Sequence, residues 1–181
     1  GNLIRMPGND PFILNPVMDP ELVFDDRRHT RYFGSYYAEV QIFEGLRYRV
    51  NMGGDYRYRR WGIYQDGTSS DRDAGTSYAR YDQYQDFSWT LENLIFYDKT
   101  VGDHRFGLTL LQSAGASRFE YSDIRVIDLP YASQLWYNVG STVGNDGNPQ
   151  SFASGYRRSQ MASYMGRLNY NYDDRYLLTA T

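Results

Sequence analysis

The two histidines are the side chains best suited to act as a general base near neutral pH, and neither has a partner at a recognisable spacing. His29 follows Asp25 and Asp26, and His104 follows a short polar stretch. A serine or cysteine nucleophile requires a base held within hydrogen-bonding distance, and no motif here predicts one. We therefore expect both histidines to be structural and the chain not to be an enzyme.

Acidic residues cluster in segments that look like loops. Residues 66–73 and 145–147 contain the oxygen ligands that calcium prefers, but neither segment has the spacing of an EF-hand. Neighbouring carboxylates such as Asp173 and Asp174 are typical of solvated turns, and a glycosidase pair cannot be recognised from spacing alone. We expect no cofactor, with calcium in these loops as the weaker alternative.

Arginines at alternate positions and aromatic residues in loop-like segments carry the stronger binding signal. The arginines, with acidic residues on neighbouring polar faces, form either a wall of compensated charges or a surface for a polar ligand. The loop aromatics could stack on sugar rings or pack against one another. The candidate contact residues are Arg47, Arg49, Arg57, Arg59, Tyr64, Tyr131, Trp136 and Tyr137.

The stretch from Thr30 to Trp61 reads as a long antiparallel hairpin. In both arms every second residue is tyrosine, aliphatic or small, and the residues between are mostly charged or polar, which is the period of a strand. Gly45 fits the left-handed position that ends a three-residue turn, Phe43-Glu44-Gly45. In this register Glu39 faces Arg49 across the strands.

Both arms keep this alternation for about twice the usual strand length of five or six residues. Tyr48 and Tyr58 lie on the apolar side of the second arm. At about 3.3 Å per residue and a strand tilt of about 40°, they are separated by roughly 25 Å along the normal to a membrane that the sheet would span. This separation matches the apolar band between the aromatic girdles of an outer-membrane barrel, so we expect the apolar sides to face lipid.

The composition excludes several other classes of protein. The net charge of -3 and the spread of arginine along the chain predict no nucleic-acid partner. The 19 tyrosines favour amphipathic surfaces such as membrane interfaces or sugar platforms. No apolar run is long enough for a transmembrane helix, and cysteine is absent. No signal peptide opens the sequence, so we expect an exported form to start at a processed or truncated residue 1.

Short turns inside hairpins alternate with long segments rich in proline, glycine and small polar residues. This alternation is typical of outer-membrane barrels. The predicted fold class is all-β, the wall of an antiparallel transmembrane barrel with about five to six strands and long extracellular loops. We expect hairpins at 30–61, 81–115 and 158–181, and loops at 1–29, 62–80 and 116–157, the last with a short helix within 122–140.

Five or six strands cannot remain an open sheet in hydrocarbon. Each edge would leave roughly five backbone groups unpaired, at several kcal/mol apiece. Since native stabilities are about 5–15 kcal/mol, nothing in the fold could offset a total of tens of kcal/mol. We expect further strands, from the same polypeptide or from other copies, to close the barrel.

Three segments resemble the SusC/RagA group of TonB-dependent outer-membrane transporters. SYMGRLNYNYDDRYLLTAT at 163–181 is similar to the tyrosine-rich barrel hairpin of that group, and FSWTLENLIFYDKTVGDHRFGLTLLQSAG at 87–115 is similar to the hairpin before it. YAEVQIFEGLRYRVNMGGDY at 37–56 resembles the preceding hairpin. The segments follow one another in the order and spacing of the family.

The resemblance implies a function for the intact molecule and not for this chain alone. It implies import of large nutrients, glycans or peptides, through a plugged barrel of about 22 strands in the outer membrane of a Gram-negative bacterium. It also implies a SusD-like surface lipoprotein as a lid, and energy from the TonB complex through an N-terminal part that this sequence lacks. The arginine set would then contact the plug or the substrate.

Alternation alone does not distinguish a side that faces lipid from a side that faces a protein core. A secreted or surface-anchored β-sandwich that binds carbohydrate is therefore the alternative. A soluble β-rich hydrolase is the weakest interpretation, because the sequence offers no pair of nucleophile and base.

Overall fold

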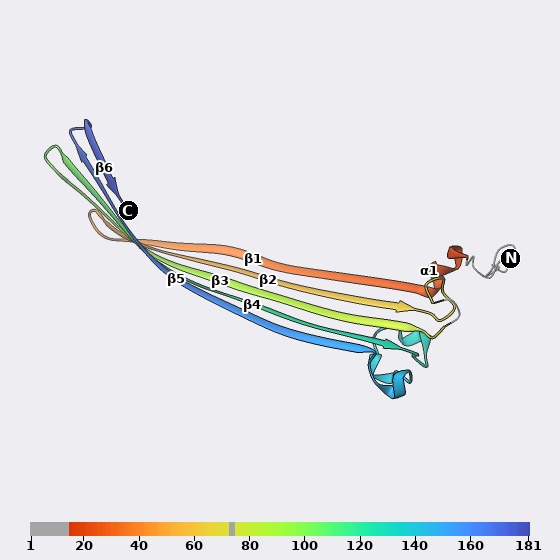
Figure 1. The fold of residues 1–181 in the computed structure, drawn as a ribbon. Coiled ribbons are helices and arrows are strands. Elements are labelled where there is room, and N and C mark those ends of the chain that lie inside the picture. The colour runs from red at the N-terminus through yellow and green to blue at the C-terminus, as the bar shows by residue number, and fades with distance from the viewer. Residues whose placement is uncertain (1–14, 73–74) are drawn as a thin grey trace. The chain divides into compact units, whose positions relative to one another are not determined.

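The computed structural model describes residues 15–72 and 75–181, which form a single sheet of six strands in chain order (Figure 1). The all-β prediction is therefore confirmed, while residues 1–14 of the predicted N-terminal loop lie outside the described residues. None of the helices in the described part is long and apolar enough to cross a membrane. The strands are β1 (Val23–Phe43), β2 (Leu46–Gln65), β3 (Tyr78–Val101), β4 (His104–Ile127), β5 (Ser151–Tyr172) and β6 (Tyr176–Ala180), preceded by the 3-10 turn η2 (Pro16–Met18) and the helix α1 (Asp19–Leu22).

The strands extend further toward the long loops than the sequence predicts. β1 already begins at Val23, β4 continues to Ile127 instead of ending near Gly115, and β5 begins at Ser151. The predicted ends lie where apolar alternation stops, but backbone pairing with a neighbouring strand does not require apolar side chains. Residues 116–127 and 151–157 are thus strand and not loop.

The long connection after β4 contains no α-helix. It contains the 3-10 helices η3 (Ala132–Gln134), η4 (Val139–Ser141) and η5 (Asn145–Gly147), so the helical structure expected within 122–140 consists of short 3-10 helices after Ile127. Residues 122–127 complete β4, and hydrogen bonds to strand ends shape the rest. Asp128 donates its backbone N–H to the Ser77 carbonyl at 2.8 Å, and the Thr142 hydroxyl donates to the Ile127 carbonyl at 2.5 Å.

Short turns join the strands of each hairpin, as the sequence predicts. Gly45 has φ +84° in the first turn, which is one residue shorter than expected because Phe43 belongs to β1. Gly102, with φ +58°, occupies the second turn. The third turn, residues 173–175, lies where it was predicted, and Tyr172 pairs with Tyr176 beyond it.

Contact density divides the chain into two units, which we describe separately. The loop unit comprises the described residues up to Thr30 with Arg57–Gln85 and Phe119–Tyr156, and it includes the long loops. The turn unit comprises Arg31–Tyr56, Asp86–Arg118 and Arg157–Thr181, and it includes the three short turns.

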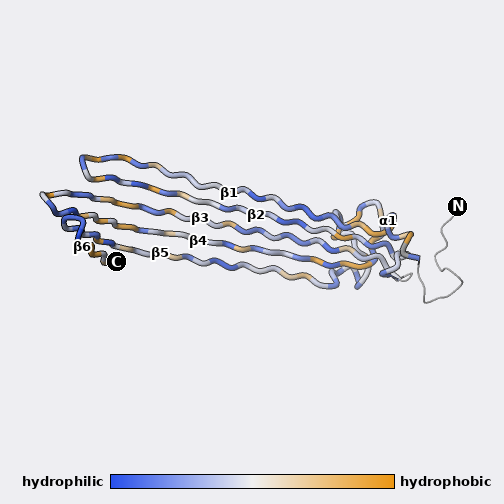
Figure 2. Tube along the Cα trace, turned by 90° about the horizontal axis from the view of Figure 1, so that it is seen from above, coloured by the Kyte–Doolittle hydropathy of each residue, from blue (hydrophilic) through white to orange (hydrophobic). Residues whose placement is uncertain are grey.

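The turn unit has an apolar face that nothing in the described residues covers. Tyr36, Val40 and Leu168, which follow the predicted apolar alternation, expose 78%, 54% and 47% of their surface. Figure 2 shows hydrophobic and hydrophilic residues succeeding one another along the strands without a long apolar block. Residues 15–72 and 75–181 contain no second sheet, so these side chains do not form the core of a sandwich.

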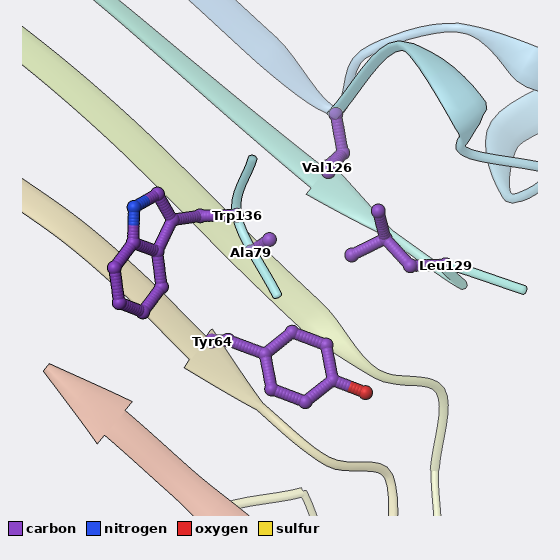
Figure 3. Close-up of a cluster of buried hydrophobic side chains, with 5 residues drawn as sticks. All are labelled: Tyr64, Ala79, Val126, Leu129 and Trp136. Atoms are coloured by element: carbon purple, nitrogen blue, oxygen red, sulfur yellow. The ribbon is translucent and has the colours of Figure 1, made fainter. Parts of the chain in front are cut away.

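The loop unit, by contrast, has a small core of its own (Figure 3). Trp136, only 4% exposed, packs over β2 at Gly62, where an added Cβ would lie 2.1 Å from the indole nitrogen. Any larger residue at Gly62 would therefore displace the indole. The core residues are Tyr64, Ala79, Val126, Leu129 and Trp136.

Asp19, at the start of α1, ties the N-terminal segment to the loop after β2. Its carboxylate accepts hydrogen bonds from the hydroxyl of Ser70 and from the Ser70 backbone N–H, the latter at 2.9 Å. These bonds, the hydroxyl first, lower the pKa of Asp19 below its ordinary value, whereas burial opposes them. The contact therefore stabilises the fold above the ordinary pKa, near 4, and is lost as the pH falls through the lowered value.

We expect the loop after β2 to loosen in acid for this reason. A spin label on Thr76→Cys, in these 181 residues without other cysteines, should become more mobile below about pH 4. In an Asp19→Ala variant the label should be mobile at every pH, because the acceptor is gone. Equal mobility of both proteins between pH 7 and pH 3 would contradict the role of Asp19.

Candidate functional site

A cluster of arginines and aromatic rings lies on the polar face of the loop unit. Trp61 of β2 continues the alternation of Arg57 and Arg59, and two guanidinium groups lie over its ring. Arg27 of β1 is 4.3 Å from the ring centre, and Arg80 of β3 is 4.6 Å from it. Such cation–π contacts stabilise by about 0.5–1 kcal/mol each at exposed sites.

Carboxylates compensate these cations. Asp25 accepts a hydrogen bond from the Trp61 indole at 2.8 Å and pairs with Arg27 at 2.8 Å. Asp82, with a fully buried side chain, pairs with Arg80 at 2.6 Å. The Trp61 cluster (Asp25, Arg27, Trp61, Arg80 and Asp82) is thus a neutral set in which each charge has a fixed partner.

A second group of rings follows on the same polar face. Arg59 lies 5.1 Å from the ring centre of Tyr84, and Tyr84 stacks at 6.3 Å on Tyr121 of β4. The Tyr121 ring lies on Gly155, where an added Cβ would be 2.2 Å from it. This arrangement offers flat aromatic surfaces and guanidinium donors, which suit contacts with a polar ligand and not covalent chemistry.

Arg47 and Arg49 of the turn unit differ in their partners. Arg47 lies 3.5 Å from Glu39 and 3.5 Å from Asp98. Arg49 instead donates to Asn51 at 2.9 Å and lies over the ring of Tyr37, so the predicted pairing of Glu39 with Arg49 is replaced by a diagonal pair with Arg47. The alternation was correct, because both arginines project on the face that carries Glu39.

The aromatic residues assigned to loops separate into two classes, and one of them, Tyr64, lies in β2 and not in a loop. Tyr64 and Trp136 are buried in the core of the loop unit (Figure 3), whereas Tyr131 and Tyr137 each expose 62% of their surface. Tyr137 packs on the Trp136 ring at 5.1 Å. Packing in this core therefore accounts for the buried pair, and ligand contact stays a prediction for Tyr131 and Tyr137 and for the four arginines.

The two histidines lie on different strands, β1 and β4. His29 lies within β1 and not in a loop, since β1 begins at Val23. The Nδ1 atom of His104 is 2.7 Å from the Tyr170 hydroxyl, and its ring lies 4.9 Å from Tyr172. In the described part of the chain, no three histidine, aspartate or glutamate side chains come together as metal ligands would.

Sequence reasoning missed the Trp61 cluster. The signal was available in β2, where Trp61 continues the polar alternation that includes Arg59. No such signal was available for Arg27 of β1 and Arg80 of β3, because the sequence predicts loops at both positions.

No protein-family model matches the sequence. Two TonB-dependent receptors of Formosa agariphila are similar to it, one 25% identical over 92% of this chain and the other 23% identical over 91%. The matches cover 16% and 17% of the two receptors, so the chain spans about a sixth of the length of these relatives.

Solved structures of similar fold include those of a peptide transport system. A structure of the RagAB peptide transporter matches with a TM-score of 0.75 at 11% identity, over 88% of this chain and 18% of the other. The RagAB peptide importer in the closed-closed state matches with a TM-score of 0.73 at 12% identity, over 84% of this chain and 17% of the other. The relatives and the fold confirm the resemblance to a segment of a SusC/RagA-type barrel wall.

Proposed function

We propose that this chain is a stretch of the wall of an outer-membrane transport barrel in a Gram-negative bacterium. The observation that carries the proposal is the apolar face of the turn unit, which is exposed and covered by no second sheet in the described residues. Contact with lipid hydrocarbon would remove this face from water, which stabilises the protein by about 25 cal/mol per Å² of apolar surface.

The edges of the sheet support closure by further strands. β1 and β6 are the outer strands, and each presents a row of backbone groups without a neighbouring strand among the described residues. In hydrocarbon these groups must be paired, and only a closed barrel pairs all of them. The remaining strands would come from the rest of the same polypeptide.

The surface of the loop unit differs from the apolar face of the turn unit. A groove of about 530 Å³ lies on it, lined by polar side chains that include Gln83, Gln85, Glu120 and Ser122. Such residues are unfavourable against hydrocarbon. We infer that the turn unit meets the lipid and that the loop unit projects into the external medium.

The proposed activity is TonB-dependent import of a large nutrient. The sequence relatives are named TonB-dependent receptors, and the structural neighbours are named peptide transporters. Import of peptides or glycans through the complete barrel, with a SusD-like lipoprotein as the lid, follows from this likeness and from the resemblance. Arg47, Arg49, Arg57 and Arg59, with the Trp61 cluster, would line the passage.

Expression of the chain within its natural flanking sequence tests this proposal. We expect the protein to stay in carbonate-washed outer membranes and to migrate faster in denaturing gels when unheated, as closed barrels do. A dispersed monomer in buffer without detergent would contradict the proposal and favour the β-sandwich.

A further inference from the structure

A row of polar side chains crosses the apolar face of the turn unit. The Tyr48 hydroxyl on β2 donates to Oδ1 of Asn93 on β3 at 2.6 Å. The Nδ2 group of Asn93 donates in turn to Oε1 of Gln112 on β4 at 2.6 Å. Three neighbouring strands therefore each contribute one polar group to a continuous hydrogen-bonded row.

The row has a direction, and it ends on a donor. Each amide oxygen in it accepts a bond from the previous member, so the Nε2 group of Gln112 is left with two N–H groups and no acceptor among the described residues. In hydrocarbon an unsatisfied amide is costly. An acceptor oxygen from outside the chain would satisfy it.

Gln112 also forms part of the wall of an apolar groove. The groove has a volume of about 430 Å³, and the missing side chain of Gly166 on β5 helps to form it. An added Cβ at Gly166 would be 3.5 Å from Leu110, an ordinary contact, so the position could hold a larger residue. The other lining residues are Tyr48, Asn93, Ile95, Leu110, Leu111, Tyr164 and Met165.

We propose that this groove binds one acyl chain of a glycerophospholipid, whose ester carbonyl accepts a hydrogen bond from Gln112. The inference rests on the proposed function, since it requires this face to meet lipid. An ester carbonyl is the acceptor that lies directly beside hydrocarbon, and the groove is continuous with the exposed apolar face. Tyr48 lies two residues into β2 from its short turn, and Gln112 lies eight residues into the 24-residue β4 from its own turn. The row therefore lies in the turn-side half of both strands, toward the leaflet on that side.

Filling the groove tests the site. In native mass spectrometry of the intact barrel with added phosphatidylethanolamine, Gly166→Phe should lower lipid occupancy about tenfold, because the ring takes the space of the acyl chain. Gly54→Phe is the matched control. An added Cβ at Gly54 meets only the Ser88 carbonyl, at 4.0 Å, and Gly54 lines a different groove, so we expect occupancy to stay unchanged.

A double variant, Asn93→Leu with Gln112→Leu, separates lipid binding from a structural role. It removes both amides but keeps the walls of the groove, so occupancy should fall by about 2- to 10-fold, the effect of one net hydrogen bond. The melting temperature of the barrel should fall little, because leucine is favourable against lipid and only the Tyr48 hydroxyl loses a partner.

Three results would overturn the inference. They are equal occupancy in the Gly166→Phe and Gly54→Phe variants, a double variant that binds phospholipid as the wild type does, and preferential binding of lipid A over phosphatidylethanolamine. If Gly166→Phe does not assemble, the double variant alone decides. A wild-type protein that never enters the membrane would refute the proposed function instead, so the two failures can be told apart.

Discussion

Replacing Trp136 by alanine should detach residues 128–150 from the strands of the loop unit. The indole is buried on Gly62 and is the largest side chain of that core. Truncating a buried tryptophan costs about 3–5 kcal/mol, which corresponds to a 100-fold or greater rise in the open population. Limited proteolysis of the membrane-embedded protein measures this opening directly, because cleavage follows the population of the open form.

Tyr137→Ala is the matched control for this variant. Tyr137 is the next residue and also aromatic, but 62% of its surface is exposed. We expect its removal to change cleavage within the loop by less than about threefold. Similar cleavage of the two variants would show that Trp136 does not hold the loop.

An arginine in place of Met52 should hinder barrel assembly. Met52 lies on the apolar face of the turn unit with 57% of its surface exposed. A charged side chain near the middle of the lipid-facing surface costs about 2–4 kcal/mol in a transmembrane barrel. The yield of heat-modifiable barrel should therefore fall steeply, and its urea midpoint should drop.

The adjacent residue supplies the control. Gly53 projects to the opposite face, and nothing lies within 4 Å of a Cβ added there. Gly53→Arg adds the same charge on the polar side, so we expect near-normal assembly. If the two variants assembled equally well, the apolar face would not meet hydrocarbon.

The sequence predicted the part of the fold in which alternation and turn chemistry agree. The hairpin around Gly45 has the expected apolar and polar faces. A shift of one residue in the strand register would move every apolar side chain of one arm to the polar face. The last turn, residues 173–175, was placed correctly for the same reason.

Strand ends without apolar alternation could not be predicted. Leu111 interrupts the pattern in β4, and the following Ala114, Gly115 and Ala116 carry no apolar signal, yet β4 continues to Ile127. The pairing there depends on neighbouring strands that are distant in sequence. For the same reason the Trp61 cluster was out of reach, since three strands contribute to it.

The role of the loop aromatics was equally undetermined. Tyr64 and Trp136 are residue types that often stack on ligands. Only the position of residues 128–150 over β2 shows that they belong to the hydrophobic core. The sequence specifies that an aromatic ring is present, but tertiary contacts decide whether other residues cover it.

The anchored connection after β4 also determines where a foreign peptide could be displayed. Asn145, Asp146 and Gly147 form an exposed tip beyond the point where Trp136 fastens the segment. An epitope spliced into that tip should be recognised by antibodies on living cells while the scaffold beneath it persists. The same epitope inserted at Trp136 would detach residues 128–150 from the strands beneath them.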